Sequence, residues 1–377
     1  MLLVVILLSL VIGVVIFIWL HGRDLAAFDR GYPRPITGSD PSDGLPDVIA
    51  TVEAFARATD GLPPGKARIR RLRVALEAIS EGKAFAAKFT PSLPSEPAGE
   101  WVQAGEADAD RRILYVHGGG FVAGSPKSHR MITSALSELT GMTVFALDYR
   151  LLPEFGRLES LEDTVEATTW LRGYGPDGPS PACFLALVGD SAGGNLILAA
   201  AQKVRDKGVA NADALVALSP STDVTLRSPS MRFNRDSDAM LGNGVGRLLR
   251  LPALIRHLIF LFMGRRSPAV PAFSPLRGHL ANLPPLLLQV SLTEMLLDDS
   301  ARYYHRAKSQ GAEVTLETYD NMVHVWHMFY PELPEARVAL ERIRDFLASV
   351  ESRQSQTFAA APREAQGHEQ GVRETGL

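Results

Sequence analysis

Short apolar runs alternate along this chain with longer stretches in which apolar residues recur every three or four positions. A run of four to eight apolar residues predicts a strand buried on both faces of a sheet, and the periodic stretches predict amphipathic helices. Strands are expected at residues 112–116, 143–147, 184–188, 214–218, 286–290 and 314–319. Helices are expected at residues 128–139, 158–172, 194–207, 300–309 and 334–350. This alternation predicts an α/β fold with a mostly parallel sheet and helices on both faces.

Two regions interrupt the alternation of strands and helices. Residues from about 47 to 100 have a helical pattern, and the connection that contains residues 225–275 is too long for a simple crossover between neighbouring strands. Both regions are expected to form a helical cap on a domain that spans residues 47–350. The last stretch, residues 351–377, is polar and lacks periodic apolar positions, so it predicts a disordered tail.

The N-terminus begins with an almost wholly apolar run over residues 2–20. A helix of this length spans a hydrocarbon core of roughly 30 Å, so the run predicts a single-pass transmembrane anchor over residues 1–21. A cleaved signal peptide is the alternative, but no Lys or Arg precedes the run. Three arginines follow it, which favours the cytoplasmic side for the remainder of the chain. Residues 22–46, rich in Pro, Gly, Ser and Asp, predict a linker.

Charge and cysteine content exclude several classes of protein. The formal net charge of the 377-residue chain is −3, so no nucleic-acid partner is expected. The chain has one cysteine, Cys183, and therefore no intrachain disulfide. Neither property predicts an oligomeric state.

The strongest chemical signal is the sequence Gly-Asp-Ser-Ala-Gly-Gly at residues 189–194. It directly follows an apolar strand and opens an Ala-rich helix. In this context the pattern G-x-S-x-G is typical of a nucleophile elbow, a sharp turn that exposes a serine hydroxyl. Glycines flank the serine because the neighbouring backbone passes too close for side chains. Ser191 is therefore the predicted catalytic nucleophile.

A second signal is the sequence His-Gly-Gly-Gly at residues 117–120, which follows the strand expected at 112–116. Acyl transfer needs backbone N–H groups directed at the developing oxyanion, and glycines let the main chain approach the substrate. We expect Gly118 and Gly119 to be donors together with Ala192, although two of the three glycines could serve in other combinations. No Lys-Ser/Thr pair follows the glycines, so a phosphate cofactor is not expected. Neither a cofactor nor a metal ion is required by the predicted chemistry.

A serine nucleophile needs a histidine base, and the base needs an orienting carboxylate. In folds with this type of elbow the chain order is serine, acid, histidine. His324 lies just after the strand expected at 314–319 and is the predicted base, whereas His327 lies three residues further on.

Three carboxylates compete for the position of the acid: Glu294, Asp298 and Asp299. Glu294 lies nearest the end of the strand expected at 286–290, where catalytic groups collect in open α/β sheets. The two aspartates have an alternative role in stabilising the first turn of the following helix. Position alone therefore favours Glu294.

The chain resembles the hormone-sensitive-lipase family of α/β hydrolases, in its bacterial carboxylesterase branch. The resemblance covers about residues 111–350 and rests on the glycine triplet at 118–120, the sequence Asp-Tyr-Arg-Leu-Leu-Pro-Glu at 148–154 and the elbow at 189–194. It implies an α/β-hydrolase fold with a helical cap and a carboxylesterase or lipase activity. It also implies that the acid is Glu294, at a position where the family more commonly has Asp.

The expected function is therefore hydrolysis of acyl esters through a Ser-His-Glu triad and an acyl-enzyme. Small-molecule or lipidic acyl esters are the expected substrates, and membrane lipid is an expected partner. The alternatives are an amidase or deacetylase of the same fold, or a catalytically silent ligand-binding module.

One segment of the cap, residues 246–263, is both apolar and basic. It predicts either a cap helix that packs on the body of the domain or an interfacial helix that dips into lipid.

Overall fold

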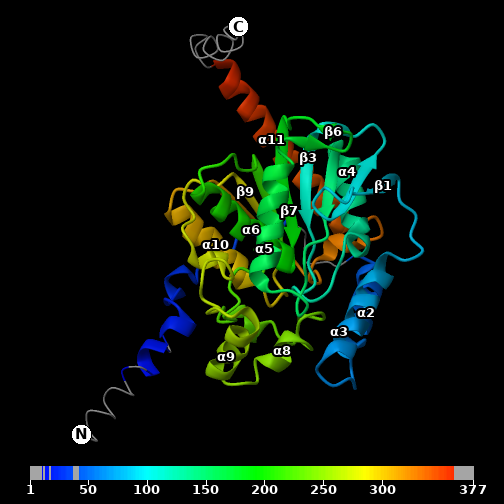
Figure 1. Ribbon diagram of the computed structural model, residues 1–377. Coiled ribbons are helices and arrows are strands. Elements are labelled where there is room, and N and C mark those ends of the chain that lie inside the picture. Colours follow the sequence, from blue (N-terminus) through cyan, green and yellow to red (C-terminus); the bar gives the residue numbers. More distant parts are fainter. Residues whose placement is uncertain (1–10, 12, 17, 37–41, 361–377) are drawn as a thin grey trace, which may run out of the picture.

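An eight-stranded sheet forms the centre of the protein (Figure 1), whose computed structural model describes residues 11, 13–16, 18–36 and 42–360. The strands are β1 Ala87–Pro91, β2 Gly99–Ala104, β3 Asp108–Val116, β4 Met142–Leu147, β7 Phe184–Asp190, β8 Ala214–Leu218, β9 Leu286–Ser291 and β10 Val314–Tyr319. They lie in the order β1-β2-β4-β3-β7-β8-β9-β10, and the six strands from β4 to β10 are parallel. The predicted α/β fold with a mostly parallel sheet is confirmed.

The sequence pattern did not predict the antiparallel edge formed by β1 and β2. Both strands lie in or beside the region assigned to the cap. β1 has only one buried residue, Ala87, so it lacks the apolar run by which the inner strands were recognised.

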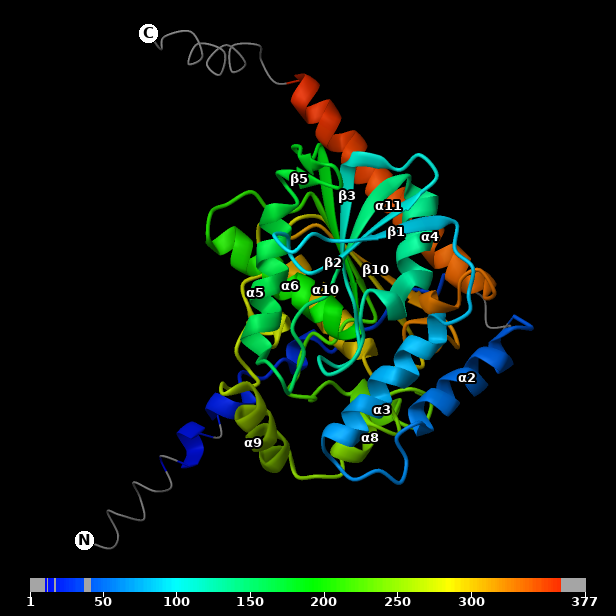
Figure 2. The ribbon, with the colours of Figure 1, turned by 45° about the vertical axis from the view of Figure 1, so that its right-hand side comes forward.

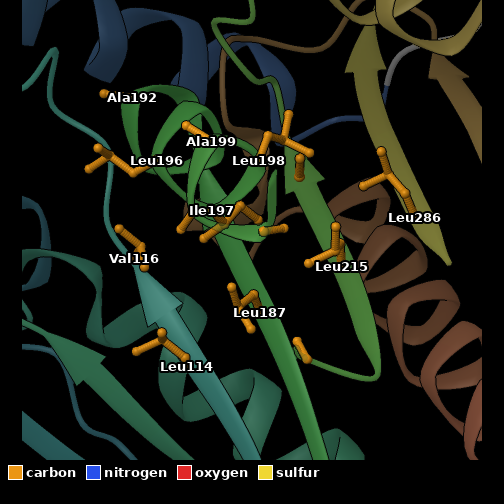
Figure 3. Close-up of a cluster of buried hydrophobic side chains, with 14 of the residues drawn as sticks. Leu114, Val116, Leu187, Ala192, Leu196, Ile197, Leu198, Ala199, Leu215 and Leu286 are labelled. Carbon is orange, nitrogen blue, oxygen red and sulfur yellow. The ribbon is translucent and has the colours of Figure 1, made fainter. Parts of the chain in front are cut away.

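Alternate residues of β3 face two separate hydrophobic cores, because successive side chains of a strand point to opposite faces. Leu114 and Val116 join one core, and Ile113 and Tyr115 join the other. The first core is covered by α5 Arg157–Trp170, α6 Ser191–Asp206 and α10 Leu297–Ser309, and the second by α2 Leu45–Arg57, α4 Arg130–Thr140 and α11 Pro334–Ala360. Figure 3 shows the α6 side chains packed between β3, β7 and β8.

The cap region contains short helices at one end of the sheet. Besides α2, they are α3 Lys66–Glu77, α7 Ser230–Phe233, α8 Val245–Leu248 and α9 Ala253–Gly264. Single turns of 3-10 helix lie at Ala26–Phe28, Ala78–Ser80, Lys127–His129, Pro275–Arg277 and Trp326–Phe329. Figures 1 and 2 place α3, α8 and α9 at the end of the molecule opposite to the projecting end of α11.

The predicted N-terminal transmembrane helix, and with it the single-pass membrane localisation, is corrected by the structure. Among the residues that are described, no helix is long and apolar enough to cross a membrane. Residues 1–10, 12 and 17 of the predicted anchor lie outside the described residues. The end of the apolar run packs against the protein: Leu20 and His21 are buried, and the carbonyl oxygen of Trp19 accepts a hydrogen bond from Ser267 Oγ at 2.7 Å.

The segment predicted as a linker contacts α10 and β10. Asp29 forms an ion pair with Arg302, Tyr32 donates a hydrogen bond to Asp298, and the backbone N–H of Ile36 donates to the carbonyl oxygen of Thr318 at 2.8 Å. Residues 37–41 lie outside the described residues.

Helix α11 continues to residue 360, ten residues into the segment predicted as a disordered tail, and residues 361–377 lie outside the described part.

A buried arginine fixes the beginning of β3. Arg112 has no exposed surface, and its guanidinium donates to the carbonyl oxygens of Ala109 at 2.6 Å, Leu171 at 2.8 Å and Ser180 at 2.9 Å. These bonds join β3 to the end of α5 and to the hairpin of β5 Tyr174–Gly175 and β6 Gly178–Pro179. Since a buried carbonyl without a donor is costly, the side chain stabilises the strand that leads to the glycine triplet.

We expect Arg112→Met to lower the free energy of unfolding by roughly 2–4 kcal/mol, because the three carbonyl groups lose their donor. Urea denaturation with an unchanged m-value measures this effect. Arg57→Met, which removes an exposed helical ion pair with Glu53, is the matched control and should change the free energy by less than about 0.5 kcal/mol. Equal effects of the two substitutions would contradict the role assigned to Arg112.

Candidate active site

Ser191 occupies a tight turn between β7 and α6. Its φ angle is +51°, in the left-handed region that a non-glycine residue seldom adopts. A Cβ atom added at Gly193 would lie 1.9 Å from the carbonyl oxygen of Val116, and one added at Gly189 would lie 2.8 Å from the backbone of Gly193. The two glycines therefore let the first turn of α6 approach β3 and β7 closely enough to hold the serine at the end of the sheet.

His324 lies between Ser191 and Glu294 in the structure. Its Nε2 is 2.9 Å from Ser191 Oγ, and its Nδ1 is 2.6 Å from Glu294 Oε2. The three residues come from the loops or turns that follow β10, β7 and β9, so the parallel strands bring together side chains that are far apart in the sequence. His324 and Glu294 are almost fully buried.

Two hydrogen bonds orient Glu294. Its Oε1 accepts from Ser219 Oγ and from the backbone N–H of Ser291, both at 2.8 Å, which leaves Oε2 directed at His324. Burial alone would lower the pKa of His324, but the hydrogen bond and the negative charge of Glu294 outweigh that effect and raise the pKa above its ordinary value of 6.5.

The two competing aspartates face away from the histidine. Asp298 accepts the backbone N–H of Ser230 at 2.6 Å, and Asp299 accepts the N–H groups of Thr222 and Asp223 at 2.8 and 2.9 Å. They bind the segment that follows β8. Burial, together with the nearby charge of Asp223, raises the pKa of Asp299 to about 7.

His327, the second candidate base, contacts Gln289 and not Ser191. It is fully buried, its Nε2 lies 2.9 Å from Gln289 Oε1, and burial lowers its pKa to about 3. The ring is therefore neutral, and its contact with Gln289 connects it to β9.

The glycine triplet is held by the residue that precedes the nucleophile. The N–H of Gly118 donates to Asp190 Oδ1 at 2.9 Å, and a Cβ atom at Gly118 would lie 2.1 Å from Asp190 Oδ2. Within the described residues, no acceptor is hydrogen-bonded to the N–H of Gly119 or Gly120. Both have positive φ angles, of 111° and 63°.

Asp190 is the centre of a buried polar cluster. Its Oδ1 also accepts the hydroxyl of Tyr115 at 2.6 Å, and its Oδ2 lies 3.6 Å from His129 Nε2. Burial would raise the pKa of Asp190, but His129 and the hydrogen bonds hold it below its usual value. Tyr149 donates to the carbonyl oxygen of His117 at 2.9 Å and so fixes the beginning of the same loop.

Arg157 is a residue near the site that the sequence pattern did not indicate. It is 7% exposed, donates to Asn195 Oδ1 at 3.0 Å, and its guanidinium carbon lies 3.2 Å from the ring centroid of Phe121. Burial lowers its pKa to about 9. An Arg in the first turn of a helix is ordinarily solvated, so the sequence contains no signal that this one is buried.

Comparison with known proteins agrees with this geometry. A family profile described as alpha/beta hydrolase fold matches residues 113–328. An acetyl-hydrolase of Streptomyces hygroscopicus is 37% identical over 248 residues, which cover 66% of this chain and 78% of that protein. A carboxylesterase/phospholipase, LipF, of Mycobacterium tuberculosis is 32% identical over 266 residues, which cover 68% and 69% of the two chains.

Among solved structures, an esterase from the bacterial hormone-sensitive lipase family superposes with a TM-score of 0.71 at 34% identity. The match covers 83% of this chain and 99% of that one.

The contact between Glu294 and His324 predicts a change in the histidine's titration. In Glu294→Gln the negative charge is lost while the ring stays buried, so the pKa of His324 should fall below 6.5. NMR titration of labelled histidine, with the resonance assigned through His324→Gln, measures the shift. Asp298→Asn, which alters the same loop without touching His324, should leave the pKa unchanged. An unchanged pKa in Glu294→Gln would contradict the proposed pairing.

Proposed function

The chain belongs to the hormone-sensitive-lipase family of α/β hydrolases, and we propose that Ser191, His324 and Glu294 form its catalytic triad. The protein is a serine ester hydrolase that acts on small-molecule esters. The observation that carries the assignment of residues is the continuous hydrogen-bonded chain from Ser191 Oγ through both ring nitrogens of His324 to Glu294 Oε2.

The reaction begins when His324 Nε2 accepts the hydroxyl proton of Ser191 as Oγ attacks the ester carbonyl carbon. The raised pKa of His324 favours this transfer, because the imidazolium that forms lies 2.6 Å from a buried carboxylate. Glu294 stays ionised and holds the ring in the tautomer that presents a basic Nε2 to the serine.

We propose that the N–H groups of Gly119, Gly120 and Ala192 stabilise the oxyanion. Gly118, expected from the sequence to be a donor, is left out of this set because its N–H already donates to Asp190. The revised set has the donors on both sides of the nucleophile: two in the loop after β3 and one at the start of α6.

The tetrahedral intermediate collapses when its bond to the alcohol oxygen breaks and His324 returns the proton to the leaving alcohol. This leaves an acyl group on Ser191. A water molecule then attacks the acyl carbon while His324 accepts its proton. In the second collapse the bond to Ser191 Oγ breaks, His324 returns the proton to that oxygen, and the carboxylic acid leaves. None of these steps requires a metal ion or a cofactor.

Lipidic acyl esters are also proposed as substrates, and membrane lipid is proposed as a partner. We also propose that residues 47–350 form the catalytic domain and that its cap consists of about residues 47–100 and 225–275.

Arg157 is proposed as a positioning residue for the oxyanion loop. It contacts Phe121, which directly follows the glycine triplet at a φ of +66°, and Asn195, one turn after the nucleophile on α6. A cation on the face of an aromatic ring is attractive, particularly away from water. Arg157 therefore connects the two backbone segments that supply the proposed oxyanion donors.

Ser191→Ala should lower kcat for p-nitrophenyl esters by at least about 10⁴-fold, because the nucleophile is lost. The full-length chain is assayed with esters from acetyl to palmitoyl, and the preferred length separates an esterase from a lipase. Surface variant Ser309→Ala is the control and should retain full activity. Turnover that persists in Ser191→Ala would contradict the assigned nucleophile. Faster cleavage of p-nitroanilides than of esters would favour an amidase.

Arg157→Met should lower kcat by about 10- to 100-fold with KM changed little, because misplaced donors weaken binding of the transition state more than that of the substrate. Arg157→Lys, which keeps a cation near Phe121, should recover part of kcat. Thermal unfolding is measured in parallel. A lower Tm with a normal kcat at low temperature would show that Arg157 supports only the fold.

A further inference from the structure

Helix α9 buries polar side chains and exposes apolar ones, which is the reverse of an ordinary surface helix. Its buried residues are Arg256 and His257, which are 4% and 0% exposed. Its exposed residues are large and apolar: Leu254, Ile255, Leu258, Phe262 and Met263, with Phe262 87% exposed. A surface helix in water normally buries its apolar stripe, so the outer face of α9 is unfavourable unless something non-aqueous covers it.

Polar contacts fix this orientation of the helix. Arg256 donates to the carbonyl oxygens of Leu249 at 3.2 Å and Leu251 at 2.8 Å, and His257 Nε2 lies 3.0 Å from the carbonyl oxygen of Thr225. Rotation of α9 to bury its leucines would break these bonds and leave the buried carbonyl oxygen of Thr225 without its contact to His257. The apolar face therefore stays outward.

A second apolar segment lies beside α9. The ring of His21 contacts that of His257 edge-on at 4.3 Å between centroids, and Ser267, just after α9, donates to the carbonyl oxygen of Trp19. Figures 1 and 2 show the N-terminal segment and α9 at the same end of the molecule. The side chains of Ile18 and Trp19 are 59% and 50% exposed, so they add to the apolar surface.

Charge around α9 is positive, whereas beside Trp19 the exposed Arg23 and Asp24 balance each other. The sequence between Asp238 and Glu294 contains no Asp or Glu but has arginines at positions 247, 250, 256, 265, 266 and 277. Arg250, Arg265 and Arg266 are exposed, and none of them forms an ion pair within the described residues. Exposed cations beside an apolar helix face are the pattern of surfaces that rest in the headgroup layer of anionic lipid.

We propose that the outer face of α9, with Ile18, Trp19 and the three exposed arginines, docks onto an anionic lipid surface. Phe262 and Leu258 enter the acyl boundary, and the guanidinium groups contact lipid phosphates. A second copy of the chain fits less well, because the same arginines would face one another across a symmetric contact. The docked protein rests on one leaflet, and the contact does not require catalysis by Ser191.

The test is a site-specific label on α9. Cys183 is the one cysteine of the chain, so Cys183→Ser combined with Phe262→Cys gives a single site for an environment-sensitive NBD fluorophore. The label is mixed with vesicles of phosphatidylcholine that contain about 30% phosphatidylglycerol, which gives a strongly negative surface. These vesicles should shift the emission of the label to the blue. Cys183→Ser with Leu93→Cys is the matched control, since Leu93 is exposed at a distant site and should show no shift.

Vesicle flotation of the unlabelled full chain supplies a second readout. Leu258→Ser with Phe262→Ser should weaken binding at least about tenfold, whereas Leu93→Ser with Phe155→Ser, which removes the same two side-chain types elsewhere, should not. Replacing Arg265 and Arg266 by Gln should remove the preference for phosphatidylglycerol over pure phosphatidylcholine. Hydrolysis of soluble p-nitrophenyl acetate should be unchanged in all of these variants, so failure of docking and failure of the catalytic assignment are separate results.

Two outcomes overturn the proposal. Flotation without a blue shift at position 262 shows that another segment binds the lipid. A blue shift at 262 without vesicles, accompanied by dimers in sedimentation, shows that a second copy covers α9.

Discussion

The carboxylate of Asp190 joins the two backbone segments on which the site depends. It ends β7, immediately before Ser191, and accepts the N–H of Gly118 and the hydroxyl of Tyr115 through one oxygen. A buried carboxylate is unfavourable unless it accepts hydrogen bonds. The bond from Gly118 is therefore retained, and the position of the glycine loop follows that of Asp190. Because Asp190 directly precedes Ser191, its hydrogen bond with Gly118 links the nucleophile to the loop of the proposed oxyanion donors.

The three carboxylates that follow β9, one in the loop and two in the first turn of α10, have different contacts. Glu294 reaches toward the sheet and contacts His324, whereas Asp298 and Asp299 bind the chain that leaves β8 for the cap. The segment that begins after β9 therefore orients the histidine and also anchors the insertion. Apolar contacts of Met231 with Met295 and Leu296 add to these polar contacts and help to hold the insertion beside the site.

Helix α9 of the cap is polar on its inner side and apolar on its outer side. On its inner side α9 presents Arg256, which donates to the carbonyl oxygen of Leu251 in the chain just before the helix, and His257, which contacts the carbonyl oxygen of Thr225. Toward the outside, it presents leucine, isoleucine and phenylalanine side chains. For a hydrolase of acyl esters, such a surface would allow the insertion after β8 also to meet an apolar phase.

Local patterns in the sequence determined the parallel core of the sheet and the order of the site residues. Apolar runs of strand length are local, and the elbow needs its glycines within five consecutive positions, so both could be recognised without a structure. Glu294 and His324 followed from their places after successive strands, because parallel strands end at one edge.

Only the tertiary structure decided the features that depend on distant contacts. Gly118 is left out of the proposed oxyanion donors because its N–H donates to Asp190, 72 residues away. Arg157 is buried because Phe121 and Asn195 surround it, which no periodicity records. The apolar N-terminal run predicted a spanning helix, yet its last residues are packed on the protein through Ser267 and His257. The hydrophobicity of a segment indicates that it is buried away from water. Only the fold determines which apolar surface buries it.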